Sequence, residues 1–300
     1  MNVNVQKSFE AAPGERADYG KLYLVGTPIG NLEDMTFRAV RTLREADIIA
    51  AEDTRQTRKL LTHFEISPGK LLSYHEHNKA ASGPELVRYI MEGKNLALVS
   101  DAGLPAISDP GSDLVRLALN AGISVIPIPG ANAALSALIV SGLPTERFMF
   151  LGFLPRDPKQ REKLLTSLED EESTMLMYES PHRLNKTLQS LLEVFGDRNI
   201  VLARELTKRY EEMARGSLKA CLGWLEEHPP LGEYCLVVEG ANPDRVKEKR
   251  EAWWKNLKIE EHVAHYEQEE GLTRKDAMKK PPPTAGYLNG IFTIHCSSSP

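Results

Sequence analysis

The sequence predicts an α/β protein built from two α/β domains with a cleft between them. In the first half of the 300 residues, short apolar runs alternate with helical patterns of about ten residues, which is typical of βαβ units and a largely parallel sheet. After a break at residues 148–160, strand-like runs outnumber helices and are spaced like hairpins. The second half is therefore expected to contain a mixed sheet.

Before the break, each short apolar run is followed by apolar residues at helical spacing. The expected strands are Leu22–Gly26, Ile48–Ala51, Leu71–Tyr74, Leu96–Ser100 and Ser124–Pro127. The expected helices are Thr36–Ala46, Thr54–His63, Ser82–Glu92, Asp113–Ala121 and Asn132–Ser141. Ligands of such sheets bind at the carboxyl ends of the strands, so we look for chemistry in the loops that follow them.

The break, "FMFLGFLPRDPKQ", contains two prolines and many charges, and it is interpreted as a linker. A second series of elements follows. The expected strands are Thr174–Tyr178, Ile200–Arg204, Glu212–Gly216 and Tyr234–Glu239, with a helix over Pro181–Phe195.

The predicted organisation has five parts. They are a disordered polar extension at 1–20, an N-terminal α/β domain at 21–150, a second α/β domain at 151–243, a helical segment at 244–280 and an unstructured or aberrant tail at 281–300. The tail follows three consecutive prolines, which stop a helix, and its composition differs abruptly from that of the preceding segment. A change of reading frame is one hypothesis for this difference.

Composition narrows the classes of function. The formal net charge is −5 and the pI is near 6.0, so nucleic-acid binding would have to depend on a local basic patch. No apolar run reaches the roughly 18 residues of a membrane span. The three cysteines show no CxxC spacing, which argues against a disulfide framework and against a zinc site. We expect a cytoplasmic protein with no metal.

The first candidate loop is "LYLVGTPIGN", where a strand runs into a turn holding Gly26, Pro28 and Gly30. A P-loop requires lysine after its last glycine, and Asn31 stands there instead. A dinucleotide fingerprint requires a glycine where Pro28 stands, and proline removes an amide donor. A phosphate-binding role is therefore rejected, and a plain tight turn is the simplest alternative.

Two further loops follow strands of the same predicted sheet. "SDAGLPAISDPG" places Asp101 at a strand end, where a carboxylate can reach a ribose or a cation, while Asp109 or Ser112 can cap the next helix. "PIPGANAALSALIVSGLP" turns at Gly130 into a helix of small residues, which allows a flat ligand or another backbone to approach closely. Three such loops at one edge of a sheet favour a binding site there.

These loops resemble those of the tetrapyrrole methylase superfamily, the class III S-adenosylmethionine methyltransferases. The stretches that carry the resemblance are "LYLVGTPIGNLEDMTFRAVRTLREADIIAAEDTRQTRKLL", "SDAGLPAISDPG", "PIPGANAALSALIVSGLPTERFMFLGFLPR", "YESPHRL" and "RELTKRYEE". "TPIGNLEDMT" together with "AEDTR" is similar to the subgroup that methylates the ribose 2′-hydroxyl of a cytidine in bacterial 16S ribosomal RNA. The resemblance covers about Lys21 to Gly240, and in the tail it fails after Ala277.

The resemblance implies that S-adenosylmethionine is held in the cleft between the domains. The implied cofactor-binding residues are Asp101, Ala102, Gly103, Ile107, Gly130, Ala131 and Asn132. Thr27, Pro28 and Asn31 would face the acceptor. The implied partner is small-subunit rRNA or the assembled small ribosomal subunit, and the family suggests a homodimer.

The second domain supplies the catalytic candidates. They are Glu179 in "YESPHR" and Arg204, Glu205 and Lys208 in "RELTKRYEE". Either glutamate can act as a base towards the ribose hydroxyl, and either cation can bind a phosphate or stabilise the alkoxide. For each residue the alternative is a surface ion pair or a helix cap, and the sequence does not decide between them.

RNA would be bound by a local group of basic residues near the cleft, the basic rim. Arg156 and Arg183 are its predicted substrate-binding members, and other basic residues lie nearby at Lys159, Arg161, Lys163, Lys186, Lys208 and Arg209. Interleaved carboxylates are equally consistent with an ordinary solvated face. Two other functions remain open, a tetrapyrrole C-methyltransferase and a noncatalytic RNA- or ribosome-binding relative. A nucleotide-dependent oxidoreductase is disfavoured because both phosphate fingerprints are absent.

Overall fold

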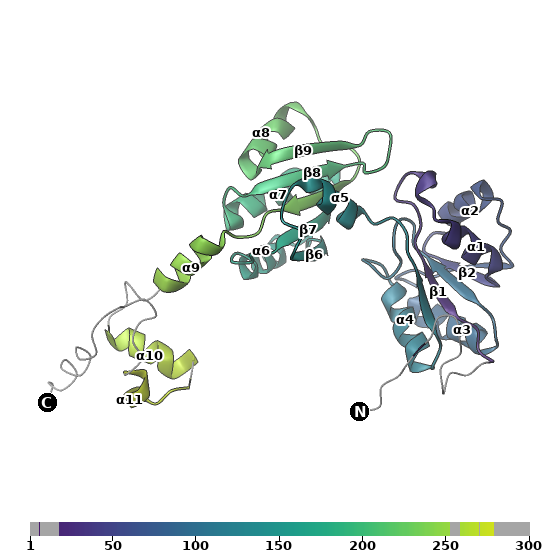
Figure 1. Cartoon of the computed structure of the whole chain (residues 1–300), viewed down its shortest axis with the longest axis horizontal. Coiled ribbons are helices and arrows are strands. Elements are labelled where there is room, and N and C mark those ends of the chain that lie inside the picture. The colour runs from purple at the N-terminus through teal and green to yellow at the C-terminus, as the bar shows by residue number, and fades with distance from the viewer. Residues whose placement is uncertain (1–5, 7–17, 253–258, 270, 279–300) are drawn as a thin grey trace. The chain divides into compact units, whose positions relative to one another are not determined.

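The computed structural model describes Gln6 and residues 18–252, 259–269 and 271–278. The chain forms two compact units: residues 1–167 together with 173–239, and residues 168–172 together with 240–300. The first unit contains two five-stranded sheets (Figure 1). The predicted α/β class is confirmed.

The first sheet has the strand order β3-β2-β4-β1-β5, and all its neighbouring strands are parallel, as predicted. Its strands are β1 (Leu22–Val25), β2 (Ile48–Ala51), β3 (Lys70–Ser73), β4 (Leu96–Val99) and β5 (Val125–Ile128). The segments between them form the 3-10 helix η1 (Leu32–Asp34) and the helices α1 (Phe37–Glu45), α2 (Thr54–His63), α3 (Lys79–Met91) and α4 (Gly111–Asn120). Each expected strand and helix of this sheet is found, with bounds shifted by up to three residues.

Local sequence explains these elements. The central strands β2 and β4 are buried along their whole length, which suits strands covered by helices on both faces. α1 begins where the Thr36 side chain accepts a hydrogen bond from the Ala39 amide, and α2 begins at the equivalent cap by Asp53.

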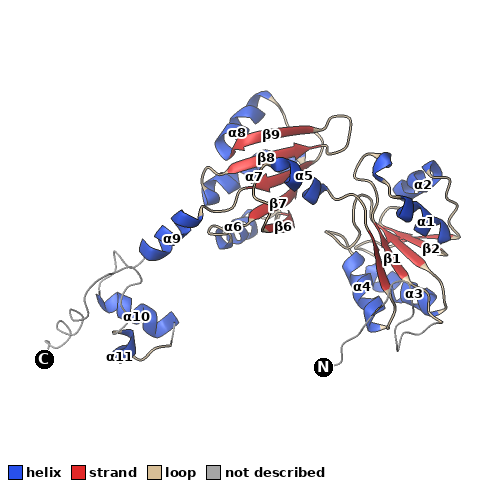
Figure 2. Cartoon of the chain, in the orientation of Figure 1, coloured by secondary structure: helices blue, strands red, loops and turns tan. Residues whose placement is uncertain are grey.

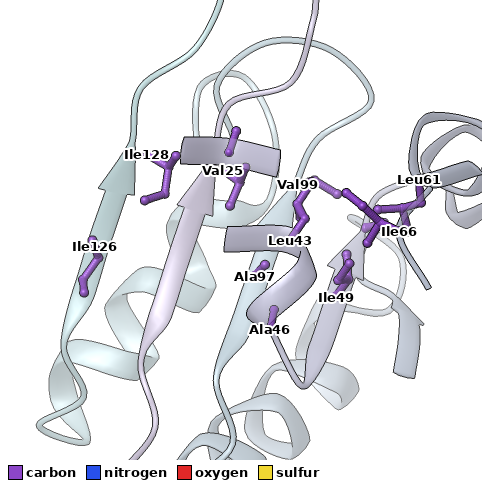
Figure 3. Packing of buried hydrophobic residues seen from close by; sticks show 12 residues of the cluster. Val25, Leu43, Ala46, Ile49, Leu61, Ile66, Ala97, Val99, Ile126 and Ile128 are labelled. Carbon is purple, nitrogen blue, oxygen red and sulfur yellow. The ribbon is translucent and has the colours of Figure 1, made fainter. Parts of the chain in front are cut away.

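Two apolar clusters hold the helices to the sheet. On one face, Leu43 of α1 and Leu61 of α2 pack with Ile49 and Val99, as Figure 3 shows. On the other face, Leu86 of α3 and residues of α4 form a second cluster. The helices are therefore divided between the two faces of one parallel sheet, and the loops at its carboxyl edge are left uncovered by them.

The second sheet is mixed, as predicted, with the order β6-β7-β10-β8-β9. Its strands are β6 (Phe148–Phe153), β7 (Thr174–Glu179), β8 (Asn199–Arg204), β9 (Glu212–Ser217) and β10 (Tyr234–Val238). Only the β6–β7 pair is parallel, and the other neighbours are antiparallel. The helices that belong to this part are α5 (Ala133–Ser141), α6 (Pro158–Ser167), α7 (Pro181–Phe195) and α8 (Leu218–Glu227) (Figure 2).

The chain passes from the first sheet to the second before residue 150, where the domain boundary is predicted. Ala137 and Leu138 of α5 pack against Val237 of β10, and β6 is an edge strand of the second sheet. Helical periodicity located α5 but could not say which sheet it would cover, because that depends on side chains about a hundred residues further along the chain. The transition therefore lies in the loop between β5 and α5.

The expected linker at residues 148–160 is a strand followed by the start of a helix. Pro158 occupies the first turn of α6, where a missing amide hydrogen costs nothing, and Asp157 accepts a hydrogen bond from the Gln160 amide. The two prolines were interpreted as a sign of irregular chain, but one of them starts a helix. α8, which was not predicted, follows β9 directly and begins at a Ser217 cap.

The remaining unit includes three described helices in the part of the chain where a helical segment at 244–280 is expected. It contains α9 (Pro243–Ala252), α10 (Ile259–Glu269) and the short α11 (Arg274–Ala277). The expected tail at 281–300 lies outside the described residues, as does most of the expected extension at 1–20. Gln6 is described, and its side-chain amide exchanges two hydrogen bonds with the backbone of Val125. Across the described helices, none combines the length and apolar character needed to cross a membrane.

Candidate active site

A cavity of about 420 Å³ lies in the first unit and is lined by loops of both sheets. Its wall from the first sheet comes from Ile29, the β4–α4 loop and the start of α5. Its wall from the second sheet comes from the ends of β6, β7 and β8 and from β10. The lining residues are Ile29, Ala102, Gly103, Leu104, Ile107, Asn132, Ala133, Phe153, Tyr178, Glu179, Ser180, Pro181, Ala203, Glu205, Leu206, Lys208, Glu233, Tyr234 and Cys235.

The glycine-rich turn after β1 allows two backbones to touch. A Cβ atom on Gly26 would lie 2.7 Å from Cα of Gly130, and a Cβ atom on Gly130 would lie 2.8 Å from Cα of Gly26. Thr27 pairs with Gly103 through two backbone hydrogen bonds of 2.9 and 3.1 Å. The loops after β1, β4 and β5 are therefore bound to one another, and the glycines serve this contact instead of a phosphate.

The same turn reaches the β8–β9 loop of the second sheet. A Cβ atom on Gly30 would collide with the side chain of Lys208, so glycine leaves the space that the lysine stem fills. The Asn31 amide donates a 3.2 Å hydrogen bond to the hydroxyl of Thr207. Thr27 and Pro28 are buried behind this contact and do not line the cavity. Of the turn, Ile29 forms cavity wall.

The β4–α4 loop contributes Ala102, Gly103 and Ile107 to the wall, as expected for cofactor-binding positions. Asp101 is exposed and does not line the cavity, since its carboxylate accepts a hydrogen bond from the Asp53 amide. Asp109 fastens the loop by accepting hydrogen bonds from the amides of Ala106 and Gly111. Burial raises the pKa of the Asp109 carboxyl, and the two amides only partly offset that effect.

The loop after β5 places one of its three expected residues at the cavity. Asn132 lines the wall and caps α5, its side-chain oxygen accepting from the Leu135 amide at 2.9 Å. Gly130 and Ala131 lie behind it: Gly130 packs against Gly26, and the Ala131 carbonyl faces Gly103. These two residues shape the wall through their neighbours.

The β7–α7 junction presents a carboxylate that is already fully used. The Glu179 side chain is 1% exposed. Its Oε1 accepts from the Ser180 amide at 2.8 Å and lies 3.4 Å from Nε of Arg183, while its Oε2 accepts from the Thr187 hydroxyl at 2.6 Å. Arg183 also donates to the carbonyl of Leu154, which ties α7 to the end of β6. Both expected residues therefore serve to hold the junction together.

The β8–β9 loop presents a carboxylate with an unused oxygen. Glu205 Oε1 accepts from Lys208 Nζ and from the Glu233 amide, each at 3.0 Å. Among the described residues, no group donates to Glu205 Oε2. Lys208 Nζ also donates to Glu233 Oε2 at 2.8 Å. Glu205, Lys208 and Glu233 all line the cavity.

The contacts within this loop set the protonation states of Glu205 and Lys208. Burial raises the pKa of Glu205, but the Lys208 hydrogen bond, the Glu233 amide and the Arg204 charge together leave the pKa below its usual value. Burial lowers the pKa of Lys208, and hydrogen bonds to Glu233 and Glu205 more than reverse this, leaving the pKa raised. Both side chains are charged throughout the neutral pH range.

Backbone strain gathers on the two loops that face each other across the cavity. Of the five non-glycine residues with positive φ in the described chain, Ala106 and Ser108 lie on the β4–α4 loop and Glu205 and Thr207 on the β8–β9 loop. Such conformations cost of order 1–3 kcal/mol each and are kept where the surrounding structure imposes them. Their position supports a functional role for both loops.

An aromatic and apolar wall was missed by sequence reasoning. Phe153 is 58% exposed at the end of β6, and its ring packs edge-on against Tyr178 with centroids 5.7 Å apart. Burial raises the pKa of the Cys235 thiol to about 12, so this side chain is a neutral part of the wall. Leu104, Leu206, Glu233 and Tyr234 were missed as well. The alternation of strand residues could have indicated their face, but not the loop that would lie over it.

The other predicted site residues lie away from the cavity. Arg204 donates to the Leu231 carbonyl and lies 3.8 Å from Glu212, which fixes the end of β8. Arg156 is exposed and lies just before α6. Neither residue lines the wall.

The cavity suits a ligand that carries positive charge and no phosphate. The wall carries three carboxylates, Glu179, Glu205 and Glu233, and one ammonium, that of Lys208, which binds Glu205 and Glu233. Side-chain oxygens already bind amides at two helix starts near the cavity: Asn132 caps α5, and Asp109 accepts from the Gly111 amide at the start of α4. An anion at either start would have to displace them. At α7 the first helical residue is Pro181, which has no amide hydrogen, and Glu179 accepts from the amide of the preceding Ser180.

Comparison with known proteins agrees with this architecture. The family model described as Tetrapyrrole (Corrin/Porphyrin) Methylases matches residues 21–221. A protein of Halalkalibacterium halodurans named ribosomal RNA small subunit methyltransferase I is 55% identical over 278 residues, 93% of each chain. The protein of that name in Bacillus subtilis is 53% identical, over 88% of this chain and 90% of its own.

Solved structures show the same fold. The methyltransferase CobJ has a TM-score of 0.57 at 21% identity, covering 74% of this chain and 95% of its own. Cobalt precorrin-4 methyltransferase has a TM-score of 0.56 at 17% identity, covering 73% and 94%.

Proposed function

The chain belongs to the tetrapyrrole (corrin/porphyrin) methylase family, and from that premise we propose that it methylates small-subunit ribosomal RNA using S-adenosylmethionine. The observation that carries the proposal is 55% identity across 93% of both chains to a protein named ribosomal RNA small subunit methyltransferase I. The family resemblance of the sequence is thereby confirmed. The solved methyltransferases share the fold at only 17% and 21% identity, so they give no comparable support to a tetrapyrrole substrate.

The cavity fits S-adenosylmethionine on three counts. Its volume of about 420 Å³ lies within the range of small-molecule sites. Its excess of carboxylates suits a sulfonium and an amino group, and the amides at the starts of α5 and α4 are already bound by Asn132 and Asp109. Ala102, Gly103, Ile107 and Asn132 would hold the cofactor, with Asp101, Gly130 and Ala131 positioning them from behind. When bound, the cofactor supplies an electrophilic methyl group on sulfur.

Glu205 is the group that accepts the proton of the ribose 2′-hydroxyl, at Oε2. This oxygen is without a partner in the described chain, and the backbone of the residue is held in a strained conformation at the cavity wall. A carboxylate with a lowered pKa is a weak base towards a free alcohol. It suffices here because a hydroxyl oxygen becomes strongly acidic as it gains a bond to carbon. General base catalysis of this kind contributes about 10²–10⁴-fold.

Lys208 pairs with two carboxylates of the site. Its ammonium fixes Glu205 Oε1 and Glu233 Oε2, so the free oxygen of Glu205 keeps one orientation. Holding the base in place before the reaction is the contribution of Lys208 to the rate. A raised pKa keeps Lys208 protonated, which excludes it as the base.

The apolar wall excludes water and orients the acceptor. Ile29, Leu104 and Leu206 leave few polar groups that could compete with the hydroxyl. The exposed ring of Phe153 offers a stacking surface for the cytidine base at the edge of the cavity. Thr27, Pro28 and Asn31 act towards the acceptor through Ile29 and Lys208, which they position. Arg156 and Arg183 remain proposed contacts to the RNA.

The acceptor we propose is the 2′-hydroxyl of a cytidine in 16S rRNA, presented either in naked rRNA or in the assembled subunit. A substrate of this kind would place the enzyme in the cytoplasm. By family resemblance we also propose a homodimer, which light scattering after size-exclusion chromatography would test.

The decisive experiment transfers radiolabelled methyl from S-adenosylmethionine to small ribosomal subunits that lack the modification, followed by nucleoside analysis. The expected product is 2′-O-methylcytidine. Cofactor binding by calorimetry without any transfer to rRNA would contradict the proposed acceptor. Methylation of a precorrin or of uroporphyrinogen instead would establish the tetrapyrrole alternative.

A further inference from the structure

One face of α2 carries a row of basic side chains that the cavity does not use. Arg55, Arg58, Lys59, Thr62 and His63 recur at the spacing that brings residues to one side of a helix. Together they line an open hollow in the surface, with a volume of about 490 Å³, which is separate from the cavity. All five side chains are exposed. α2, with the sequence TRQTRKLLTH, contains no carboxylate.

Two of these cations are available for an outside partner. Arg55 is bound to Asp53 at 2.8 Å, and this contact lowers the pKa of Asp53 to about 2, so the pair is neutral as a whole at neutral pH. In the described part of the chain, Lys59 hydrogen-bonds only the uncharged amide oxygen of Gln56, at 3.3 Å. Among the described residues, the Arg58 guanidinium has neither a hydrogen bond nor an ion pair. No described carboxylate therefore neutralises Arg58 or Lys59.

The row starts beside the active-site loop. The Asp53 amide, at the cap of α2, donates to Asp101, and the residues that follow Asp101 line the cavity. From Arg55 to His63 the helix extends about 12 Å away from this point. At the far end, Arg44 of α1 donates to the carbonyl of Phe64, which adds a cation. α1 and α2 cover the same face of the first sheet, as Figures 1 and 3 show.

We propose that this face of α2 is a docking site for the phosphodiester backbone of the RNA substrate, outside the segment that enters the cavity. The inference rests on the proposed function. Every lining side chain ends in a cationic or polar group, and two of the cations are not neutralised by described residues, so the charge of the surface suits a polyanion. A chain of net charge −5 repels RNA overall, so its grip must come from local patches such as this one.

The test measures binding of small-subunit rRNA by the full chain across a range of KCl concentrations. The variant is Arg58→Gln with Lys59→Gln. The matched control is Arg88→Gln with Arg116→Gln, which removes the same charge from the exposed side chains of α3 and α4 on the opposite face of the sheet. Because each single-strand phosphate contact contributes about 0.7 to the salt slope, the variant should lose about 1.4 in slope and about tenfold in affinity at low salt. The control should behave as wild type.

Methyl transfer then separates the two proposals. The variant should show a raised KM for rRNA with kcat and S-adenosylmethionine binding unchanged. An unchanged salt slope, or a slope lowered equally by the control, would overturn the docking site even if the wild type methylates rRNA. If the wild type transfers no methyl to rRNA while the variant still loses slope selectively, the proposed function falls and the docking site stands.

Discussion

The β7–α7 junction and the β8–β9 loop each bring a glutamate to the same cavity, but the two segments differ in what their carboxylates are free to do. Glu179 is 1% exposed and both its oxygens are bound, to Ser180 and Arg183 on one side and to Thr187 on the other. Glu205 is 17% exposed, and within the described chain only its Oε1 is bound. The first carboxylate holds a helix in place, whereas the second can take part in a reaction.

The two segments also differ in how the rest of the chain holds them. α7 starts at a proline in ordinary helical geometry, and the Glu179 and Arg183 side chains at its start bind within α7 and to the Leu154 carbonyl at the end of β6. The β8–β9 loop contains two strained residues and is contacted by Gly30 and Asn31 from the first sheet. Strained residues in a loop at the cavity wall support a functional role for that loop.

The largest effect is expected from Glu205→Gln. The amide keeps the size of the side chain but cannot accept a proton, so turnover should fall by about 10²–10⁴-fold with rRNA and cofactor binding retained. The measurement is kcat for methyl transfer to small subunits. Glu233→Gln is the matched control, because it removes a charge from the same lysine at an exposed site and should cost less than about fivefold. Equal losses of kcat in Glu205→Gln and Glu233→Gln would contradict a special role of Glu205 in the reaction.

Lys208→Met should have the next largest effect. It retains the stem that packs on Gly30 but removes the cation that orients Glu205, and we expect a loss of about 10²–10³-fold in kcat. Lys208→Arg should restore a substantial part of the activity, while Lys219→Met on α8 should change nothing. If Lys208→Met raised only the KM for RNA, the lysine would belong to substrate binding and not to the reaction.

Gly30→Ala is expected to cost about tenfold in kcat with little change in stability. The added Cβ displaces the Lys208 side chain at an exposed turn, so the ammonium loses its position without loss of core packing. Gly223→Ala on α8 makes the same substitution where nothing lies within 4 Å, and its kcat should match that of wild type. Turnover of Gly30→Ala at the wild-type rate would show that the contact between the turn and Lys208 is incidental.

Glu179→Gln should have the smallest effect on turnover and a clear effect on stability. The substitution weakens charge-assisted hydrogen bonds in a buried cluster, which costs about 1–3 kcal/mol in the free energy of unfolding. Thermal unfolding should therefore shift down by several degrees, while Glu193→Gln, exposed on the same helix, should leave it unchanged. A variant that is stable but inactive would make Glu179 the reacting carboxylate.

The sequence was sufficient for the first sheet because period and capping are local signals. Thr54–His63 and Pro181–Phe195 were predicted with the bounds that the structure shows. α5 was predicted as a helix of the first domain. It packs on the second sheet instead, because its partners on β10 are distant in sequence. α6 was hidden by a proline that stands at its first position.

The site was predictable as a set of loops but not as a set of roles. The three loops at the edge of the first sheet do meet the cavity, through Ile29, Gly103 and Asn132. The choice between Glu179 and Glu205 depends on which oxygens are engaged, and the partners that decide it include Thr187 and the Glu233 amide. Those contacts arise from folding, so no spacing within "YESPHR" or "RELTKRYEE" could reveal them.

The most direct test of the account is single-turnover methyl transfer to unmodified small subunits by Glu205→Gln and Glu179→Gln, measured side by side below the unfolding transition of either variant. The account predicts that Glu179→Gln forms 2′-O-methylcytidine at close to the wild-type rate while Glu205→Gln is slower by at least about 10²-fold. The reverse order, or equal rates, would contradict the assignment of the reaction to the β8–β9 loop.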